Sequence, residues 1–119
     1  MSGKPLGDRG ERLAAEHLER AGWLILHRNF RVGRKEIDLV ARRGEVVAFV
    51  EVKTRSGLGY GHPLEAITWR KRREIHQVAS AWIARHGHPG ELYRFDAIAV
   101  RLAAGGAPVL EHVEDAWRM

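Results

Sequence analysis

Cysteine is absent from the 119 residues of this sequence. Its absence excludes disulfide bonds, zinc sites built from thiolates and a cysteine nucleophile. Long apolar runs are absent too. None approaches the ~20 residues that a membrane-spanning helix needs, so we expect no contact with a membrane. Because no apolar stretch follows the first five residues, we also expect no signal peptide and a cytoplasmic protein.

Acidic residues are fewer than basic ones. The chain has 15 Asp and Glu against 20 Lys and Arg, which gives a net charge of +5. Most of the basic residues are arginine, whose planar guanidinium group suits phosphate, so the charge weakly favours a nucleic-acid partner. With 45% hydrophobic and 29% charged residues, no repeat and no long linker, the sequence predicts one folded domain over residues 1–119.

Hydrophobic periodicity predicts helices and strands in the order α-β-β-β-α-β-β. The first helix is expected to begin at Asp8 as N-cap, with Glu11 completing a capping box, and to end at Gly22. The second is expected to begin at Pro63, or at Thr68 if that residue caps a separate helix. The expected strands are 23–30, 36–42, 46–53, 92–102 and 109–113. A hairpin next to a helical crossover implies a mixed sheet flanked by helices.

Two carboxylates and a lysine lie where the second and third predicted strands meet. Glu51 and Lys53 are two positions apart, so they point to the same face of one strand. A connecting loop of two or four residues would pair Asp38 with Phe49. Asp38 would then lie diagonal to Glu51 on that face, with roughly 7–8 Å between the Cβ atoms. A loop of three or five residues would instead turn Asp38 to the opposite face.

Two carboxylates at this separation can share one divalent cation through bonds of about 2.0–2.6 Å. Without a cation they repel each other at the end of an apolar strand, so we expect positive charge nearby, part of it from Lys53. A bound Mg²⁺ would lower the pKa of a water molecule and stabilise the charge that develops on a phosphate during hydrolysis. The trio therefore indicates a phosphodiester hydrolase, although Glu-x-Lys on a strand is also typical of a solvated surface ion pair.

The segments around this trio resemble a known family. Residues 36–40 and 49–55 closely match motifs of the YraN family, which belongs to the PD-(D/E)XK nuclease-like superfamily. The resemblance covers nearly the whole chain, with further matching segments at 7–11, 14–15, 22–31, 61–66, 71 and 94–96. Ile37 stands where the superfamily motif has proline, a change that resolvase-like branches tolerate. The resemblance implies a restriction-endonuclease-like α/β fold, a mixed β-sheet flanked by helices with an α-β-β-β-α-β core.

The resemblance also implies roles for the site residues. Asp38 and Glu51 would bind Mg²⁺ or Mn²⁺, with the carbonyl group of Val52 as a third ligand. Lys53 would be the catalytic lysine. Glu11 corresponds to an acid of the first helix that completes the metal site in Holliday junction resolvases. Glu11 is therefore left with two interpretations, metal ligand and helix cap.

Four residues are candidates for nucleic-acid binding. Arg70 and Lys71 belong to a basic run on the second predicted helix, a pattern more typical of a solvated helix face. Lys71 matches a family position near the active face, so we predict that Lys71 and Arg70 contact phosphate. Arg55 and Ser56 begin a loop after the third strand, and we predict that they contact nucleic acid too, although they also fit ordinary turn chemistry. Trp69, beside the basic run, could stack on a base.

Other patterns in the sequence lead elsewhere. The glycine-rich segment 57–61 lies between a strand and a helix, but the third glycine of a dinucleotide-binding loop falls at His62, and no acid follows about 20 residues later. Asp96 is expected to form hydrogen bonds with Arg94 or a nearby loop rather than to join a site. The tail with Trp117 is expected to pack on the core.

Together these features predict a Mg²⁺- or Mn²⁺-dependent nuclease acting on DNA, with branched or damaged DNA included. The alternative is a nucleic-acid-binding module that retains the nuclease fold without turnover, and a weaker one is a protein-interaction scaffold. Resolvase-like enzymes often pair two sites for two strands, so analogy also allows a homodimer.

Overall fold

The computed structural model describes residues 4–56 and 63–118, so the glycine-rich segment 57–61 and His62 lie outside the described residues. The elements are α1 (Lys4–Arg20), β1 (Leu24–Val32), β2 (Lys35–Arg43), β3 (Val46–Ser56), the short 3₁₀ helix η1 (Pro63–Ala66), α2 (Trp69–His86), β4 (Leu92–Leu102) and β5 (Val109–Trp117). This order confirms the predicted α-β-β-β-α-β-β arrangement. No helix in the described part of the chain is long and apolar enough to cross a membrane.

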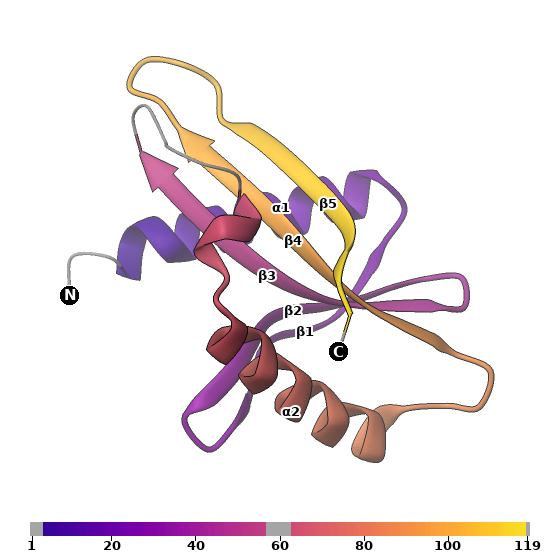
Figure 1. The fold of residues 1–119 in the computed structure, drawn as a ribbon. Coiled ribbons are helices and arrows are strands. Elements are labelled where there is room, and N and C mark those ends of the chain that lie inside the picture. Colours follow the sequence, from indigo (N-terminus) through magenta and orange to yellow (C-terminus); the bar gives the residue numbers. More distant parts are fainter. Residues whose placement is uncertain (1–3, 57–62, 119) are drawn as a thin grey trace.

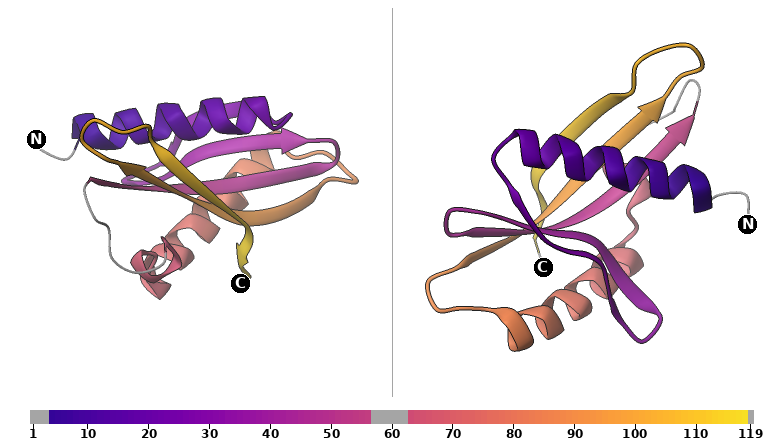
Figure 2. Two further views of the ribbon diagram at one scale, coloured as in Figure 1. Left: turned by 90° about the horizontal axis from the view of Figure 1, so that it is seen from above. Right: turned by 180° about the vertical axis from the view of Figure 1, so that it is seen from behind.

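The strands form one sheet in the order β1-β2-β3-β4-β5. Strands β3 and β4 are parallel and joined through α2, whereas the other neighbours are antiparallel. Helix α1 covers one face of the sheet and α2 covers the other (Figure 1, Figure 2). The predicted fold class, a mixed α/β sheet flanked by helices, is therefore confirmed.

Each face of the sheet has its own hydrophobic core. The α1-side core comprises Ala14, Ala15, Leu18, Trp23, Leu39, Ala41, Ala48, Val50, Val52, Ile98, Val100 and Leu102. The α2-side core comprises Ile37, Val40, Val47, Phe49, Ile67, Ile75, Val78, Ala79, Trp82, Ala97 and Trp117. Strand β3 contributes alternate residues to both cores, as a central strand must.

Helix α1 begins earlier than predicted. It starts at Lys4, so Asp8 lies inside the helix and is not its N-cap, and the predicted capping box with Glu11 is wrong. Proline is tolerated in the first turn of a helix, and Leu6 packs against the α1-side core, which favours helix before Asp8. The end is as predicted. Gly22 has φ 92, and the amide of the next residue, Trp23, donates to the Leu18 carbonyl group at 2.9 Å.

Helix α2 follows the second of the two predicted alternatives. Thr68 is its N-cap, and the Thr68 Oγ1 accepts a hydrogen bond from the Lys71 amide at 3.1 Å. Strand β5 is longer than predicted because it runs to Trp117 rather than ending at position 113. Trp117 is buried and stacks on Phe95 with 5.4 Å between ring centroids, so the prediction that the tail packs on the core is confirmed.

The β2–β3 hairpin has a different register from the predicted one. Its turn is the pair Gly44 and Glu45, and Phe49 pairs with Val40 rather than with Asp38. Gly44 has φ 61, a conformation that suits glycine at the start of a two-residue turn. The shift of two positions preserves the face on which each side chain lies. Continued by one step, this register places Asp38 directly opposite Glu51 instead of diagonal to it.

Candidate functional site

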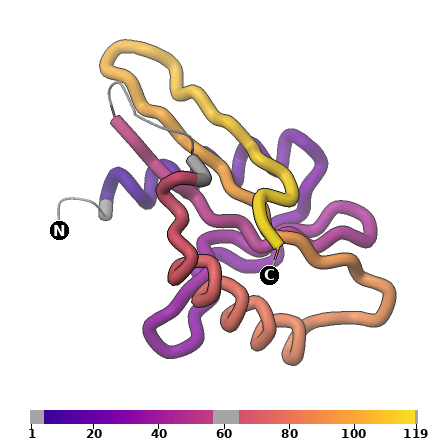
Figure 3. The backbone as a smooth tube through the Cα atoms, in the orientation of Figure 1, coloured from indigo at the N-terminus to yellow at the C-terminus, as the bar shows by residue number. Residues whose placement is uncertain are grey.

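The sheet divides at Asp38. The pairing of β2 with β3 ends at Leu39 and Val50, whereas β3 and β4 remain paired as far as Ser56. Beyond this point the β1–β2 hairpin runs toward α2 while β3 continues alongside β4 (Figure 1, Figure 3). Asp38 is the first β2 residue after the two strands part, and we call this place the fork.

Strand β2 also turns over at the fork. In a regular strand Ile37 and Leu39 would share a face, but Leu39 packs in the α1-side core and Ile37 packs in the α2-side core. The Asp38 carboxylate lies between them, and its Oδ2 accepts a hydrogen bond from the Val52 amide at 2.8 Å. The Val52 amide of β3 thus donates to the Asp38 side chain, because at this point the β2 backbone no longer pairs with β3.

Glu51 is buried on β3, and two lysines converge on one of its oxygens. Its Oε2 is 3.5 Å from the Nζ of Lys53 and 3.8 Å from the Nζ of Lys71. Lys53 follows on the same strand, whereas Lys71 reaches the site from the first turn of α2, which the Thr68 cap orients. When both carboxyl groups are ionised, the other oxygen, Oε1, is buried without a hydrogen-bond partner among the described residues.

The two neighbouring carboxylates disfavour each other's charge. Burial raises the pKa of Asp38 to about 8. The Glu51 carboxylate adds to the rise through its charge and through a hydrogen bond that a protonated Asp38 can donate to it, while the Val52 amide and Lys71 oppose the rise. Asp38 is only 8% exposed and Glu51 only 3%, so water does little to screen this repulsion. Lys53 and Lys71 compensate part of the negative charge of Asp38 and Glu51. A further positive charge would reduce the remaining repulsion between the two carboxylates.

This donor set fits a divalent cation. Carboxylate oxygens are ligands that Mg²⁺ and Mn²⁺ prefer, and a cation would give the unpartnered Oε1 of Glu51 the partner that burial otherwise denies it. Within residues 4–56 and 63–118, no three His, Asp or Glu side chains form a group that could hold a metal. The fork therefore offers Asp38 and Glu51 as direct ligands, with other positions left to backbone or water. For Val52, the contact with Asp38 is made by its amide, and the carbonyl group as ligand stays a prediction.

Glu11 lies at the edge of this site on α1. The preceding residue, Gly10, is buried so closely against β3 that a side chain there would overlap the Thr54 hydroxyl group. Glu11 Oε1 accepts a hydrogen bond from the Asn29 Nδ2 at 2.9 Å. Burial raises the pKa of Glu11, the Asn29 hydrogen bond opposes this, and the charge of Asp38 adds to the rise. Glu11 is thus electrostatically coupled to the fork and is not a helix cap.

The predicted nucleic-acid-binding residues are distributed around the fork. Lys71 is half-buried against Glu51. Arg70, the next residue back, is exposed on α2 with its Nε 3.8 Å from Glu74. Arg55 and Ser56 do not begin a loop as predicted: β3 extends to Ser56, and both residues are exposed at its end. The predicted group therefore includes one residue inside the site and three on the surface beside it.

The basic residues are unevenly distributed over the molecule. Basic side chains outnumber acidic ones on the β1–β2 hairpin and on α2, whereas β5 carries Glu111, Glu114 and Asp115 and no lysine or arginine. The hairpin and α2 lie on the same side of the molecule (Figure 1). The exposed indole of Trp69 lies at the start of α2, with the Arg72 guanidinium 5.7 Å from its ring centroid. Positive charge and an aromatic surface therefore occur together near the fork.

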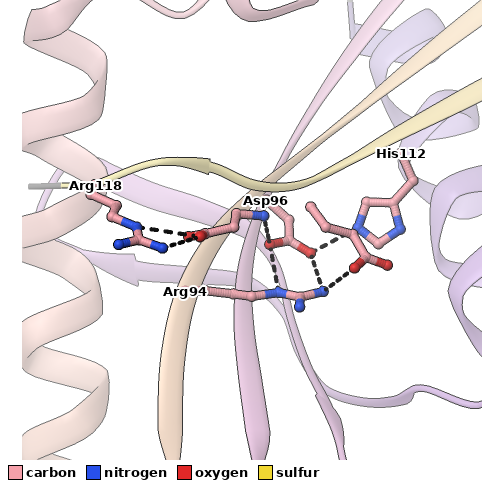
Figure 4. A network of polar contacts seen from close by, with 6 residues as sticks. Arg94, Asp96, His112 and Arg118 are labelled. Atoms are coloured by element: carbon pink, nitrogen blue, oxygen red, sulfur yellow. Dashed lines mark hydrogen bonds and ion pairs between the residues drawn. The ribbon is translucent and has the colours of Figure 1, made fainter.

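Asp96 belongs to a separate network on the α1 side of the sheet. It accepts hydrogen bonds from Nε and Nη2 of Arg94 at 3.0 and 3.1 Å and from the Asp115 amide at 3.0 Å, and His112 Nε2 lies 2.8 Å away (Figure 4). Burial alone would raise the pKa of Asp96, but the contacts with His112, the Asp115 amide and Arg94 together lower it. The expected pairing with Arg94 is confirmed, and the carboxylate has no capacity left for a ligand.

Asn29 is a site residue that the sequence analysis missed. The sequence places it in a predicted strand and in the family-matching segment 22–31 but gives it no role; in the structure it has φ 50 and contacts Glu11. Asparagine is the commonest residue after glycine in this conformation, so the residue type alone was a weak signal.

Comparison with known proteins gives a consistent family. Residues 10–100 match the family model of the uncharacterised protein family UPF0102. The chain is 46% identical over 112 residues to a UPF0102 protein of Rhodococcus jostii, a match that covers 94% of this chain and 95% of that protein. It is 47% identical over 116 residues to a UPF0102 protein of Geobacter sulfurreducens, with 98% and 91% covered.

Proposed function

The chain belongs to the uncharacterised protein family UPF0102, the YraN family, and we propose that it is a nuclease that hydrolyses phosphodiester bonds in DNA with Mg²⁺ or Mn²⁺ as cofactor. The observation that carries this proposal is the environment of Glu51. One of its buried oxygens has no hydrogen-bond partner among the described residues, and the other is within 4.0 Å of two lysines. Asp38 adds a second carboxylate beside it.

Each residue of the fork has a role in the proposed reaction. Asp38 and Glu51 would hold the cation, with the carbonyl group of Val52 as a further ligand. When bound, the cation supplies an acidic water molecule and neutralises charge on the phosphate. The ammonium groups of Lys53 and Lys71 lie next to the cation position, where they can donate hydrogen bonds to phosphate oxygens as negative charge develops.

The charge distribution supports DNA as the substrate. A duplex presents closely spaced phosphates, and Arg and Lys groups supply most of the affinity for them. The basic hairpin and α2 flank the fork and would follow the backbone on either side of the reacting phosphate. The resemblance to Holliday junction resolvases selects branched or damaged DNA for the first assays. A homodimer that presents two such sites is part of this proposal, because it would cut both strands.

The test is cleavage of four-way junction, flap and single-stranded DNA in the presence of Mn²⁺. We expect Lys53→Ala and Glu51→Gln each to lose at least about 100-fold in rate. Glu45→Gln is the matched control, because Glu45 is an exposed acid at the β2–β3 turn, and it should cleave like the wild type. Equal cleavage by the wild type and Lys53→Ala would indicate a contaminating nuclease and would overturn the proposal. DNA binding with neither cleavage nor Mn²⁺ binding would favour a non-catalytic nucleic-acid-binding module.

A further inference from the structure

Asn29 has an unusual backbone for a residue inside a strand. Its φ of 50 lies in the left-handed region, which residues other than glycine rarely adopt. The pairing of β1 with β2 continues on both sides, with Arg28 opposite Leu39 and Phe30 opposite Ile37. This register places Asn29 opposite Asp38, at the level where β2 turns over. The left-handed residue and the reversal of β2 therefore occur at one step of the hairpin.

The side chain of Asn29 links this hairpin to α1. Its Nδ2 donates to the Glu11 Oε1 at 2.9 Å. No hydrogen bond in the described part of the chain engages the Oε2 of Glu11. The bond is exposed, so it contributes little to the free energy of unfolding, but it determines which way the Glu11 carboxylate faces.

We propose that Asn29 is a positioning residue of the fork. Its left-handed backbone turns the hairpin so that Asp38 leaves the β2–β3 ladder, and its amide holds Glu11 at the edge of the cation position. Among the described residues Glu11 does not complete a group of three carboxylates with Asp38 and Glu51, so it would act by accepting a hydrogen bond from water bound to the cation. Mg²⁺ keeps several of its waters in protein sites, and residues that orient such acceptors typically change metal affinity by 10–100-fold. This inference rests on the proposed metal site.

Two substitutions separate the backbone role from the amide role. Asn29→Gly retains easy access to positive φ but removes the amide, whereas Asn29→Ala removes both. We expect Asn29→Gly to weaken Mn²⁺ binding about 10-fold, measured by titration calorimetry, with a thermal midpoint close to that of the wild type. Asn29→Ala should bind Mn²⁺ still more weakly and melt at a lower temperature. If Asn29→Ala does not fold, that loss supports the backbone role and Asn29→Gly carries the test of the amide role.

A double variant tests the link with Glu11. Glu11→Gln should weaken Mn²⁺ binding about as much as Asn29→Gly does. The combined variant should bind Mn²⁺ no more weakly than Glu11→Gln alone, because both substitutions act on the same interaction, that of the Glu11 carboxylate with the hydrated cation. Wild-type Mn²⁺ affinity in Asn29→Gly, or fully additive losses, would overturn the inference while leaving the proposed nuclease site intact. Failure of the wild type to bind Mn²⁺ would overturn both.

Discussion

The Asp38 carboxylate of β2 accepts a hydrogen bond from the Val52 amide of β3 at 2.8 Å, at the place where these two strands separate. A side chain thus replaces the backbone partner that β2 would otherwise supply. The same carboxylate lies beside Glu51, which raises its pKa in addition to the effect of burial. Asp38 therefore stabilises the fold as a hydrogen-bond acceptor and destabilises it as a buried charge. A substitution that keeps the acceptor and removes the charge separates these two effects.

Asp38→Asn should make the protein more stable and unable to bind metal. The asparagine oxygen can still accept from the Val52 amide, while the repulsion with Glu51 disappears. We expect the free energy of unfolding at about pH 8.5 to rise by roughly 1–2 kcal/mol in urea titrations without metal. Mn²⁺ binding should be lost in calorimetry. Glu45→Gln is the control for removing an acid, and a less stable Asp38→Asn would contradict the expectation.

Lys71 and Arg70 are sequence neighbours with different surroundings, which makes them a matched pair. Lys71 contacts buried Glu51, whereas Arg70 is 87% exposed. We expect Lys71→Ala to reduce the rate of DNA cleavage by at least about 10-fold, because it removes a cation beside the reacting phosphate. Arg70→Ala should change the rate by less than about threefold and mainly weaken DNA binding. Equal effects of the two substitutions on single-turnover rates would contradict a role for Lys71 in the reaction.

Arg28 and Arg34 are exposed on the β1–β2 hairpin and test its contribution to DNA binding. Replacing both by alanine should weaken binding at low salt and lower the slope of log affinity against log salt by about 2, because each phosphate contact contributes roughly 0.9. Fluorescence anisotropy over a salt series measures this slope. The control is Arg20→Ala with Arg118→Ala, two exposed arginines outside the hairpin and α2. An equal fall in slope for the control would show that DNA binding depends on the net charge of the protein and not on the position of these arginines.

Asp96→Asn should destabilise the protein without affecting metal binding. Asp96 is fully buried and is contacted by Arg94, His112 and the Asp115 amide. Removing its charge leaves buried donors imperfectly paired, which should cost roughly 2–4 kcal/mol in urea unfolding at neutral pH.

The same carboxylate makes a pH-dependent contribution. The pKa of Asp96 is lowered in the folded protein, so its stabilising effect is present above the unfolded pKa of about 3.9 and is lost as the pH falls below it. The difference in stability between the wild type and Asp96→Asn should therefore shrink below about pH 4. A difference that is constant between about pH 7 and pH 3 would contradict this assignment.

Local patterns in the sequence were sufficient for the element order and for the expectation that Asp38 and Glu51 lie close together. Hydrophobic alternation identifies strands from short windows, and the parity of the hairpin follows from any even-numbered turn. The Thr68 cap is also a local signal, since its hydroxyl bonds to an amide three residues away. These features depend on residues close together in the chain.

Features that depend on distant residues were missed. The early start of α1 depends on the packing of Leu6 against the core, and the full length of β5 depends on Asp115, which has φ 51 and donates its amide to Asp96 on another strand. The fork requires β2 to leave one neighbour while keeping the other. No short window around Asp38 contains that information, and the left-handed backbone of Asn29 is equally hidden in a strand-like segment.

The contact between α1 and β3 at Gly10 makes the fork vulnerable at a residue that has no functional group. Even one methyl group there would act as a wedge between the helix and Thr54. The first half of α1 would tilt outward, and Glu11, the very next residue, would travel with it. A substitution at Gly10 would therefore act on the fork by displacing Glu11. The alignment of Glu11 depends on the absence of a side chain at Gly10.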